Sequence, residues 1–287
     1  MTYKAILNDN KRDGTVTTSD GITLPYTVYG NDSTTRLRLV LIHSLAMSRL
    51  LWKPVAERLA SRATILTLDC RGHGDATKAS GPYRLEDFAS DLAQLMDHLG
   101  WAKAYVAGAS MGGSVALQFA VSYPSRVLGL GLIDTTAWYG AEAKQRWEWR
   151  AHEAEEKGLG ALIDFQQTRW FTDKYREQNT EEGARCRSIF LAGAVSSFAA
   201  TCRMLGDFDL RSKLSGLEMP TAVVVGDEDY ATPPDMARVL QSGIPGATLQ
   251  VIPAARHLTF VERPDVVADA LSELLDRPSP FLTSSLP

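Results

Sequence analysis

Short apolar runs alternate along the chain with longer segments in which apolar residues recur at helical spacing. The apolar or β-branched runs lie at residues 22–29, 37–42, 64–68, 104–109, 127–133, 221–225 and 248–252. Helical patterns lie between most of them, at residues 51–60, 85–99, 111–121, 234–241 and 264–275. This alternation predicts an α/β fold, in which helices cover both faces of a mostly parallel sheet. We expect the first two runs to form an antiparallel hairpin at one edge.

One stretch interrupts the alternation. Residues 136–214 carry little strand signal but much Ala, Glu, Arg, Gln and Lys, which favours helices. The stretch also holds several large aromatic residues, and we expect most of them to pack in a small core of its own: Trp138, Trp147, Trp149, Phe165, Trp170 and Phe171. We predict a helical cap over the carboxyl ends of the strands, where ligands of open α/β sheets bind.

The predicted organisation is therefore a core in two parts with the cap between them. Residues 1–135 form the first part of the core, residues 136–214 the cap, and residues 215–287 the second part. The end of the chain, from about residue 277, is rich in Pro and Ser, and we expect it to be loosely ordered.

Composition narrows the class of protein. The chain has 287 residues, 45% of them hydrophobic, which is ample for a large core. A net charge of −4 with no block of Lys or Arg argues against a nucleic-acid partner. No apolar run approaches the length of a membrane span, and residues 1–14 lack the apolar region of a signal peptide. We therefore expect a cytoplasmic protein with a small-molecule substrate, whose oligomeric state stays open, a homodimer being one option.

The three cysteines indicate the oxidation state of their thiols. Cys70, Cys186 and Cys202 are odd in number and lack C-x-x-C spacing. Such a set fits reduced thiols and argues against a disulfide framework or a thiolate metal site. No metal and no cofactor is expected.

The most informative motif is G-x-S-x-G at Gly108, Ser110 and Gly112. A serine at the tip of a sharp strand-to-helix turn needs neighbours without bulk on both sides, and glycines provide that. An apolar run ends at residue 109 and a helical pattern starts at residue 111, which is the required setting. The motif predicts Ser110 as a nucleophile, with the Met111 N–H as one donor to an oxyanion.

A serine hydroxyl needs a base near neutral pH, and the chain offers five histidines. His257 follows the last predicted strand and precedes the last helix, which places it at the edge of the sheet where ligands bind. His98 lies inside a predicted helix and His152 in a charged part of the cap, while His43 and His73 lie in loops after strands. We predict that His257 is the base and that His43 holds its own loop.

The base needs an orienting acid, which in this architecture lies between the serine and the histidine in chain order. Asp227, Glu228 and Asp229 follow the strand at residues 221–225, and Asp229 is the best placed of the three to reach the histidine loop. Asp134, at the end of the strand at residues 127–133, is the alternative acid. A second oxyanion donor is expected from the loop at residues 43–46, where we favour the Leu45 N–H.

These motifs carry a family resemblance. G-x-S-x-G at Ser110, D-x-R-G-H-G at residues 69–74, G-x-x-D at Asp229 and the late His257 together resemble the α/β-hydrolase superfamily. Within it, the chain is similar to the 3-oxoadipate enol-lactonases over about residues 20–275, and the pieces that match are residues 43–45, 81–87, 169–172, 229–234 and 244–247.

This resemblance implies a fold and an activity. The fold would be a mostly parallel eight-stranded sheet with helices on both faces and a helical cap. The activity would be cofactor-free hydrolysis of a small anionic enol-lactone, with Ser110, Asp229 and His257 as the catalytic triad. An anionic substrate needs cations or donors, and Arg49, Arg169 and Trp170 are candidates, with Ser44 and Trp138 as further pocket residues.

The chain also departs from the enol-lactonase pattern. Residues 46–49 read Ala-Met-Ser-Arg where a Gly-rich stretch is common, Met111 stands where Leu is frequent, and the segment before Gly14 is longer than usual. The substrate therefore stays open among an enol-lactone, a carboxylic ester, another lactone and a substrate of C–C bond hydrolysis. A non-catalytic small-molecule receptor on the same scaffold is the alternative from another class. Families with an aspartate nucleophile are disfavoured by Ser110.

Overall fold

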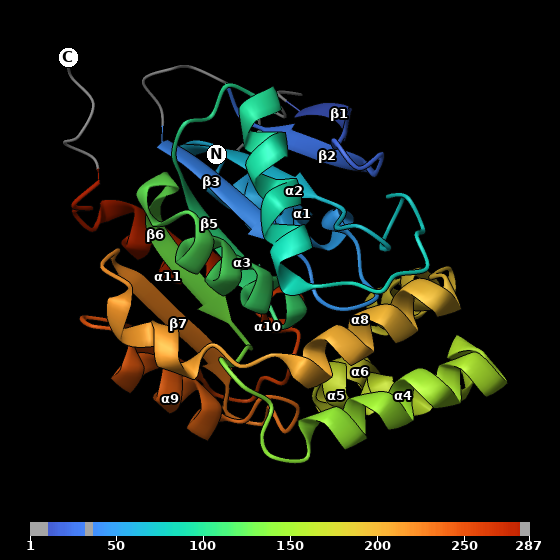
Figure 1. The fold of residues 1–287 in the computed structure, drawn as a ribbon. Coiled ribbons are helices and arrows are strands. Elements are labelled where there is room, and N and C mark those ends of the chain that lie inside the picture. Colours follow the sequence, from blue (N-terminus) through green and yellow to red (C-terminus); the bar gives the residue numbers. More distant parts are fainter. Residues whose placement is uncertain (1–10, 32–36, 282–287) are drawn as a thin grey trace, which may run out of the picture.

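A single sheet of eight strands forms the centre of the molecule (Figure 1). The computed structural model describes residues 11–31 and 37–281. The strand order across the sheet is β1-β2-β4-β3-β5-β6-β7-β8. The bounds are β1 Lys11–Thr17, β2 Thr23–Tyr29, β3 Leu37–Ile42, β4 Ala63–Leu68, β5 Ala104–Ala109, β6 Val127–Ile133, β7 Thr221–Gly226 and β8 Thr248–Ile252. From β4 to β8 all neighbouring strands are parallel, so the predicted mostly parallel sheet is confirmed.

The antiparallel edge differs from the prediction. β2 pairs with β1 on one side and β4 on the other, both antiparallel, whereas β3 lies inside the sheet between β4 and β5. The expected hairpin between residues 22–29 and 37–42 is therefore wrong. β1 was missed because it is a largely exposed edge strand with only one aliphatic residue, Val16, whereas the last four residues of β3 are all buried, as in the middle of a parallel sheet.

Helices cover both faces of the sheet, as predicted. Figure 1 shows α2 (Leu85–His98) and α3 (Met111–Ser122) side by side on one face, while α1 (Lys53–Leu59) and α11 (Pro264–Asp276) pack together on the other. The remaining core helices are α9 (Pro234–Gly243), the short α10 (Thr259–Glu262) and the 3₁₀ turns η1 (Arg49–Trp52), η2 (Pro124–Arg126) and η4 (Arg211–Gly216).

The helices between β6 and η4 form a separate layer at the carboxyl ends of the strands (Figure 1). They are α4 (Ala143–Lys157), η3 (Leu159–Leu162), α5 (Ile163–Trp170), α6 (Asp173–Gln178), α7 (Thr180–Leu191) and α8 (Val195–Asp207). α4 and α8 pack along each other. Among the cap aromatics, Trp147, Trp170 and Phe171 are buried, whereas Trp149 and Phe165 are exposed.

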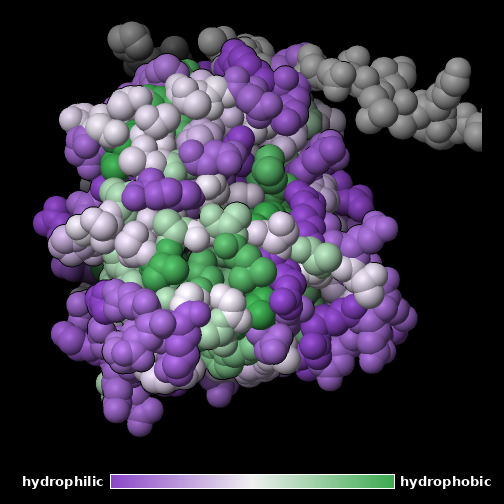
Figure 2. All heavy atoms as spheres, turned by 90° about the vertical axis from the view of Figure 1, so that its right-hand side faces the viewer, coloured by the Kyte–Doolittle hydropathy of each residue, from purple (hydrophilic) through white to green (hydrophobic). Residues whose placement is uncertain are grey.

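Figure 2 shows an apolar patch in the middle of one face. The cap and the core share an apolar cavity, which Leu50 of the core lines together with Leu159 and Ile189 of the cap. Polar bonds also join the two parts. The Leu258 N–H donates to the Trp170 carbonyl at 3.0 Å, and the buried Glu262 carboxylate accepts from the backbone N–H of Thr172 at 3.0 Å and of Arg256 at 2.9 Å. Glu262 thus ties the loop after α5 to the loop after β8.

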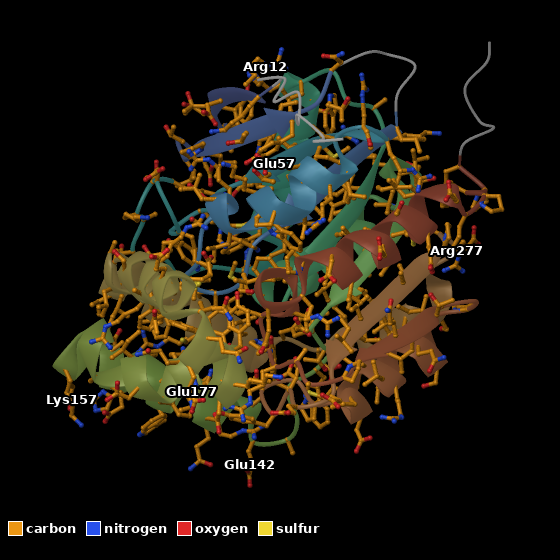
Figure 3. All side chains as sticks on the ribbon, turned by 180° about the vertical axis from the view of Figure 1, so that it is seen from behind. Arg12, Glu57, Glu142, Lys157, Glu177 and Arg277 are labelled. Carbon is orange, nitrogen blue, oxygen red and sulfur yellow. The ribbon has the colours of Figure 1, made fainter. Side chains whose placement is uncertain are left out.

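The end of the described chain packs on the core. Arg277, labelled in Figure 3, donates to the carbonyls of Thr221 and Gly246, and Lys103 donates to the carbonyl of Phe281. Arg277 and Phe281 thus contact the core, while most of the tail expected to be loosely ordered from about residue 277 lies beyond the described residues. Residues 282–287 and most of the N-terminal segment lie outside the described residues.

No single helix in the described part of the chain is long and apolar enough to cross a membrane. Only α7 and α8 taken together reach that length and composition, and they meet at a bend of 94°.

The role of Glu262 gives a stability prediction. Glu262→Ala leaves buried N–H donors of Thr172 and Arg256 without their acceptor, so we expect the free energy of unfolding to fall by about 1–3 kcal/mol. Urea unfolding measures this, and Glu262→Gln, which keeps one acceptor oxygen, serves as the milder control. Equal unfolding midpoints for wild type and Glu262→Ala would contradict the assigned role.

Candidate active site

Ser110 lies on a sharp turn between β5 and α3 and has an unusual backbone conformation, with φ of 54° and ψ of −119°. Its N–H donates to the Ile133 carbonyl at 2.9 Å, and its own carbonyl accepts from the Thr135 hydroxyl at 2.8 Å. A Cβ atom on Gly108 would overlap the Gly112 carbonyl, and one on Gly112 would overlap the Ile42 carbonyl. The two glycines of the motif are therefore required by close backbone contacts on both sides of the serine.

Three side chains from distant parts of the chain form a line of hydrogen bonds. The Ser110 Oγ lies 2.8 Å from the Nε2 of His257, and the Nδ1 of His257 lies 2.8 Å from the Oδ2 of Asp229. The histidine stands in the loop after β8 and the aspartate in the loop after β7. In this arrangement Nδ1–H donates to the carboxylate, so Nε2 is free to accept the serine proton.

The Asp229 carboxylate is buried and surrounded by donors. Oδ1 accepts from the N–H groups of Ala231 at 2.7 Å and Thr232 at 3.0 Å, and Oδ2 accepts from the Thr232 hydroxyl at 2.8 Å. These bonds fix the position of the carboxyl group, which in turn orients the imidazole of His257.

The alternative acid, Asp134, has other partners. Its Oδ1 accepts from the Gly226 N–H at 3.2 Å, and its Oδ2 accepts from the N–H and hydroxyl of Thr259 at 2.9 and 2.6 Å. Burial, and next the charge of Asp229, raise the pKa of Asp134 well above its ordinary value. Asp134 therefore joins the ends of the two loops that carry Asp229 and His257, and it makes no hydrogen bond to the imidazole.

The two amides predicted to bind an oxyanion lie beside the serine. Met111 is the first residue of α3, and Leu45 lines the same cavity as Ser110. Neither N–H donates to an acceptor among the described residues, so both are available to a ligand. The Ser44 hydroxyl donates to the Ala109 carbonyl at 3.4 Å, which links the loop after β3 to the turn at the serine.

The cavity at Ser110 contains some of the predicted substrate-binding residues. Ser44, Arg169 and Trp170 line it. Seven further lining residues were not predicted from the sequence. Ala231, Thr232 and Leu258 stand close to Asp229 and His257 in the chain, and four come from the cap or its approach: Tyr139, Trp147, Arg150 and Gln166. Arg150 lies three residues after the buried Trp147 on α4, and this spacing on the apolar face of a helix is the signal that could have indicated it.

Two predicted pocket residues lie elsewhere. The Arg49 guanidinium forms ion pairs with Asp69 and Asp75, so its charge is neutralised within the core. Trp138 packs under the Arg211 guanidinium, which lies 3.6 Å from the centroid of its ring, and it does not line the cavity. Arg49 and Trp138 therefore lie outside the candidate site.

Arg150 and Arg169 differ from Arg49 because no carboxylate among the described residues pairs with either of them. Their guanidinium groups lie 5.0 Å from the centroid of the same Phe165 ring. Burial, and then the nearby charge of Arg169, lower the pKa of Arg150 to about 10, and burial lowers the pKa of Arg169. Two poorly hydrated cations without an acidic partner favour an anionic ligand.

The other histidines take no part in this arrangement. His43 Nδ1–H donates to the Ser44 carbonyl at 2.8 Å and its Nε2 accepts from the Cys70 N–H at 3.0 Å. Burial lowers the pKa of His43 to about 4 and that of His73 to about 3, so both rings are neutral. Within residues 11–31 and 37–281, no group of three or more His, Cys, Asp or Glu is arranged to hold a metal ion.

Fold and site together define the class of protein. A sheet of this order, a serine on a strand-to-helix turn and a histidine after the last strand are the features of an alpha/beta hydrolase. The sequence model for the alpha/beta hydrolase fold matches residues 38–264, and the chain belongs to this family.

Three relatives resemble this chain over most of its length. 3-Oxoadipate enol-lactonase 2 of Acinetobacter baylyi is 29% identical over 260 residues, covering 91% of this chain and 96% of its own. The crystal structure of the enol-lactonase from Burkholderia xenovorans superposes with a TM-score of 0.88 at 30% identity, covering 92% of this chain and 100% of that one. A thermophilic esterase from Thermogutta terrifontis, described as malate bound, has a TM-score of 0.85 at 31% identity, covering 92% and 98%.

The two candidate acids can be separated by mutation. In Asp229→Asn the side-chain amide no longer fixes the tautomer of His257 that carries its proton on Nδ1. We therefore expect kcat for p-nitrophenyl acetate to fall about 10³- to 10⁴-fold with the fold intact. Circular dichroism and thermal unfolding check the fold. Near-normal turnover of Asp229→Asn would move the role of the acid to Asp134.

Proposed function

We propose that this protein is a serine hydrolase that opens a small, carboxylate-bearing enol-lactone through an acyl-enzyme. The observation that carries this proposal is the pair Arg150 and Arg169, which line the cavity at Ser110 without an acidic partner among the described residues. A hydrolase for neutral esters has no use for two cations without an ion-pair partner there, whereas a carboxylate on the substrate would pair with both. The similarity to two enol-lactonases supports the same class of substrate.

The proposed reaction starts with proton transfer. His257 Nε2, 2.8 Å from the Ser110 Oγ, takes the serine proton as the oxygen attacks the lactone carbonyl. Asp229 holds Nδ1–H and stabilises the imidazolium that forms. The amides of Leu45 and Met111 would donate to the oxyanion, and each such donor is worth about 3 kcal/mol.

Ring opening then expels the enolate oxygen. His257 returns the proton to this leaving group, and the acyl chain stays attached to Ser110 as an ester. Water then attacks the acyl-enzyme with His257 again as base, which releases the acid and restores the serine. An enolate is a good leaving group, so the first half of the reaction needs little more than the general base and the two amides.

The substrate carboxylate would be held by Arg150 and Arg169. Arginine binds carboxylates through two parallel hydrogen bonds, which fixes orientation as well as supplying charge. Such an anchor places the lactone carbonyl against Ser110. The similar esterase from Thermogutta terrifontis is described as malate bound, and malate is a dicarboxylate, which supports an anionic ligand for the proposed site.

The role of the arginines predicts a charge-specific defect. In Arg169→Gln and Arg150→Gln we expect KM for 3-oxoadipate enol-lactone to rise about ten- to hundredfold, because a charge-assisted hydrogen bond is lost, with a smaller change in kcat. KM for the neutral p-nitrophenyl acetate should stay within about twofold of wild type. Arg211→Gln is the matched control, since Arg211 also lies over an aromatic ring but is paired with Asp209.

The assay itself separates the substrate classes. Initial rates are compared for the enol-lactone, saturated lactones and p-nitrophenyl esters. We expect kcat/KM to be highest for the enol-lactone. If neutral esters exceed it by a wide margin, and Arg169→Gln is indifferent to substrate charge, the protein is a carboxylesterase instead.

A further inference from the structure

A second, larger cavity adjoins the one at Ser110. It lies between α4, α5 and the loop after β7, and we call it the outer hollow. The outer hollow and the catalytic cavity share five lining residues: Tyr139, Trp147, Arg150, Arg169 and Ala231. The two spaces are therefore neighbours on either side of the arginine pair.

Exposed aromatic side chains gather in the outer hollow. Trp149 of α4, Phe165 of α5 and Tyr230 of the loop after β7 are 51%, 37% and 48% exposed, and all three line it. They are the only large aromatic residues this exposed within residues 11–31 and 37–281. Rings left in water at one concave site are typical of a surface that recognises a ligand.

The same rings hold the arginines. The Arg150 guanidinium lies 4.5 Å from the centroid of the Trp147 ring and 5.0 Å from that of Phe165, and the Arg169 guanidinium lies 5.0 Å from Phe165 and 5.3 Å from Tyr230. Aromatic faces attract a cation without cancelling its charge. The outer hollow therefore combines flat apolar surfaces with two positive charges that are available to an anion.

The volumes of the two spaces suggest how a substrate is divided between them. The catalytic cavity has about 40 Å³, which is room for a few water-sized groups, whereas the outer hollow has about 560 Å³. The carbonyl that reacts with Ser110 fits the first space. A larger substituent of the substrate has to lie in the second.

We propose that the outer hollow is a second substrate subsite, which binds an aromatic ring carried by the substrate beyond the carboxylate held by Arg150 and Arg169. This inference rests on the proposed function and extends the substrate class to carboxylate-bearing lactones or esters with such a ring. Aromatic stacking or edge contacts with Trp149, Phe165 and Tyr230 would supply the affinity.

Another cavity on the molecule is a weaker candidate for the ring. It lies where the cap meets the core and is lined by Leu50, Leu159, Ile189 and Phe198 among others. It shares no lining residue with the catalytic cavity, and neither Arg150 nor Arg169 reaches it. A ligand there would lie apart from the arginine pair.

The test compares two dicarboxylates that differ by one benzyl group and contain no ester or lactone bond to hydrolyse. Succinate and 2-benzylsuccinate are titrated into the wild-type protein by calorimetry. We expect 2-benzylsuccinate to bind about tenfold more tightly, because its ring packs against Trp149 and Phe165. In Trp149→Ala this preference should fall below about threefold, and Trp149→Phe should restore most of it.

Two further variants locate the effect. Leu191→Ala removes an exposed apolar side chain of the cap that lines none of the three cavities, and it should keep the wild-type preference. Arg169→Gln should weaken both ligands by a similar factor and so preserve the ratio.

The outcomes that overturn the inference are distinct from those that overturn the proposed function. Equal affinities of the wild type for the two ligands, including no measurable binding of either, or a ring preference that survives Trp149→Ala, exclude the outer hollow as a ring subsite. Succinate binding that is indifferent to Arg169→Gln instead excludes the carboxylate anchor, whatever the ring does.

Discussion

The backbone of Ser110 is the constraint on which the rest of the structure depends. Its φ of 54° and ψ of −119° lie in a region that ordinary residues avoid, at a free-energy cost of about 1–3 kcal/mol. The neighbouring strand stabilises this conformation, since Ile133 and Thr135 bond the N–H and the carbonyl of the serine. The parallel sheet then brings the loops after β7 and β8 to the same edge, where His257 contacts the hydroxyl and Asp229 contacts His257.

At this edge of the sheet the carboxyl groups and the arginines have different kinds of partner. Among the buried acids here, Asp134 accepts three hydrogen bonds and Asp229 accepts four, so the positions of both carboxyl groups are fixed. Arg150 and Arg169 lie against aromatic rings instead of acids. Neither arginine forms an ion pair with a carboxylate of the described residues, and in the proposed function this difference favours an anionic substrate over a neutral one.

Features that depend on nearby residues could be predicted from the sequence, whereas features that depend on how distant elements pack could not. The turn at Ser110 depends on glycines two residues away, so a local motif was enough to indicate it, and chain order indicated His257 and Asp229. Neither motif nor chain order indicates Arg150. Its spacing from Trp147 could have placed it on the inner face of α4, but its position at the cavity depends on how α4 packs on α8 and on the core. Arg49 was wrongly predicted to bind substrate for the same reason, because its partner Asp69 lies twenty residues away on another element. The polar edge strand β1 carries too little apolar signal to be read.

The central claim is that Ser110 is a nucleophile activated by His257. The rate of labelling by a fluorophosphonate measures the reactivity of the Ser110 hydroxyl most directly. Intact-mass spectrometry follows the adduct on the wild type, Ser110→Ala and His257→Ala. We expect a single adduct on the wild type, none on Ser110→Ala, and labelling of His257→Ala that is slower by about a thousandfold or more. A wild-type protein that stays unlabelled, or a His257→Ala variant that reacts as fast as the wild type, would contradict the account.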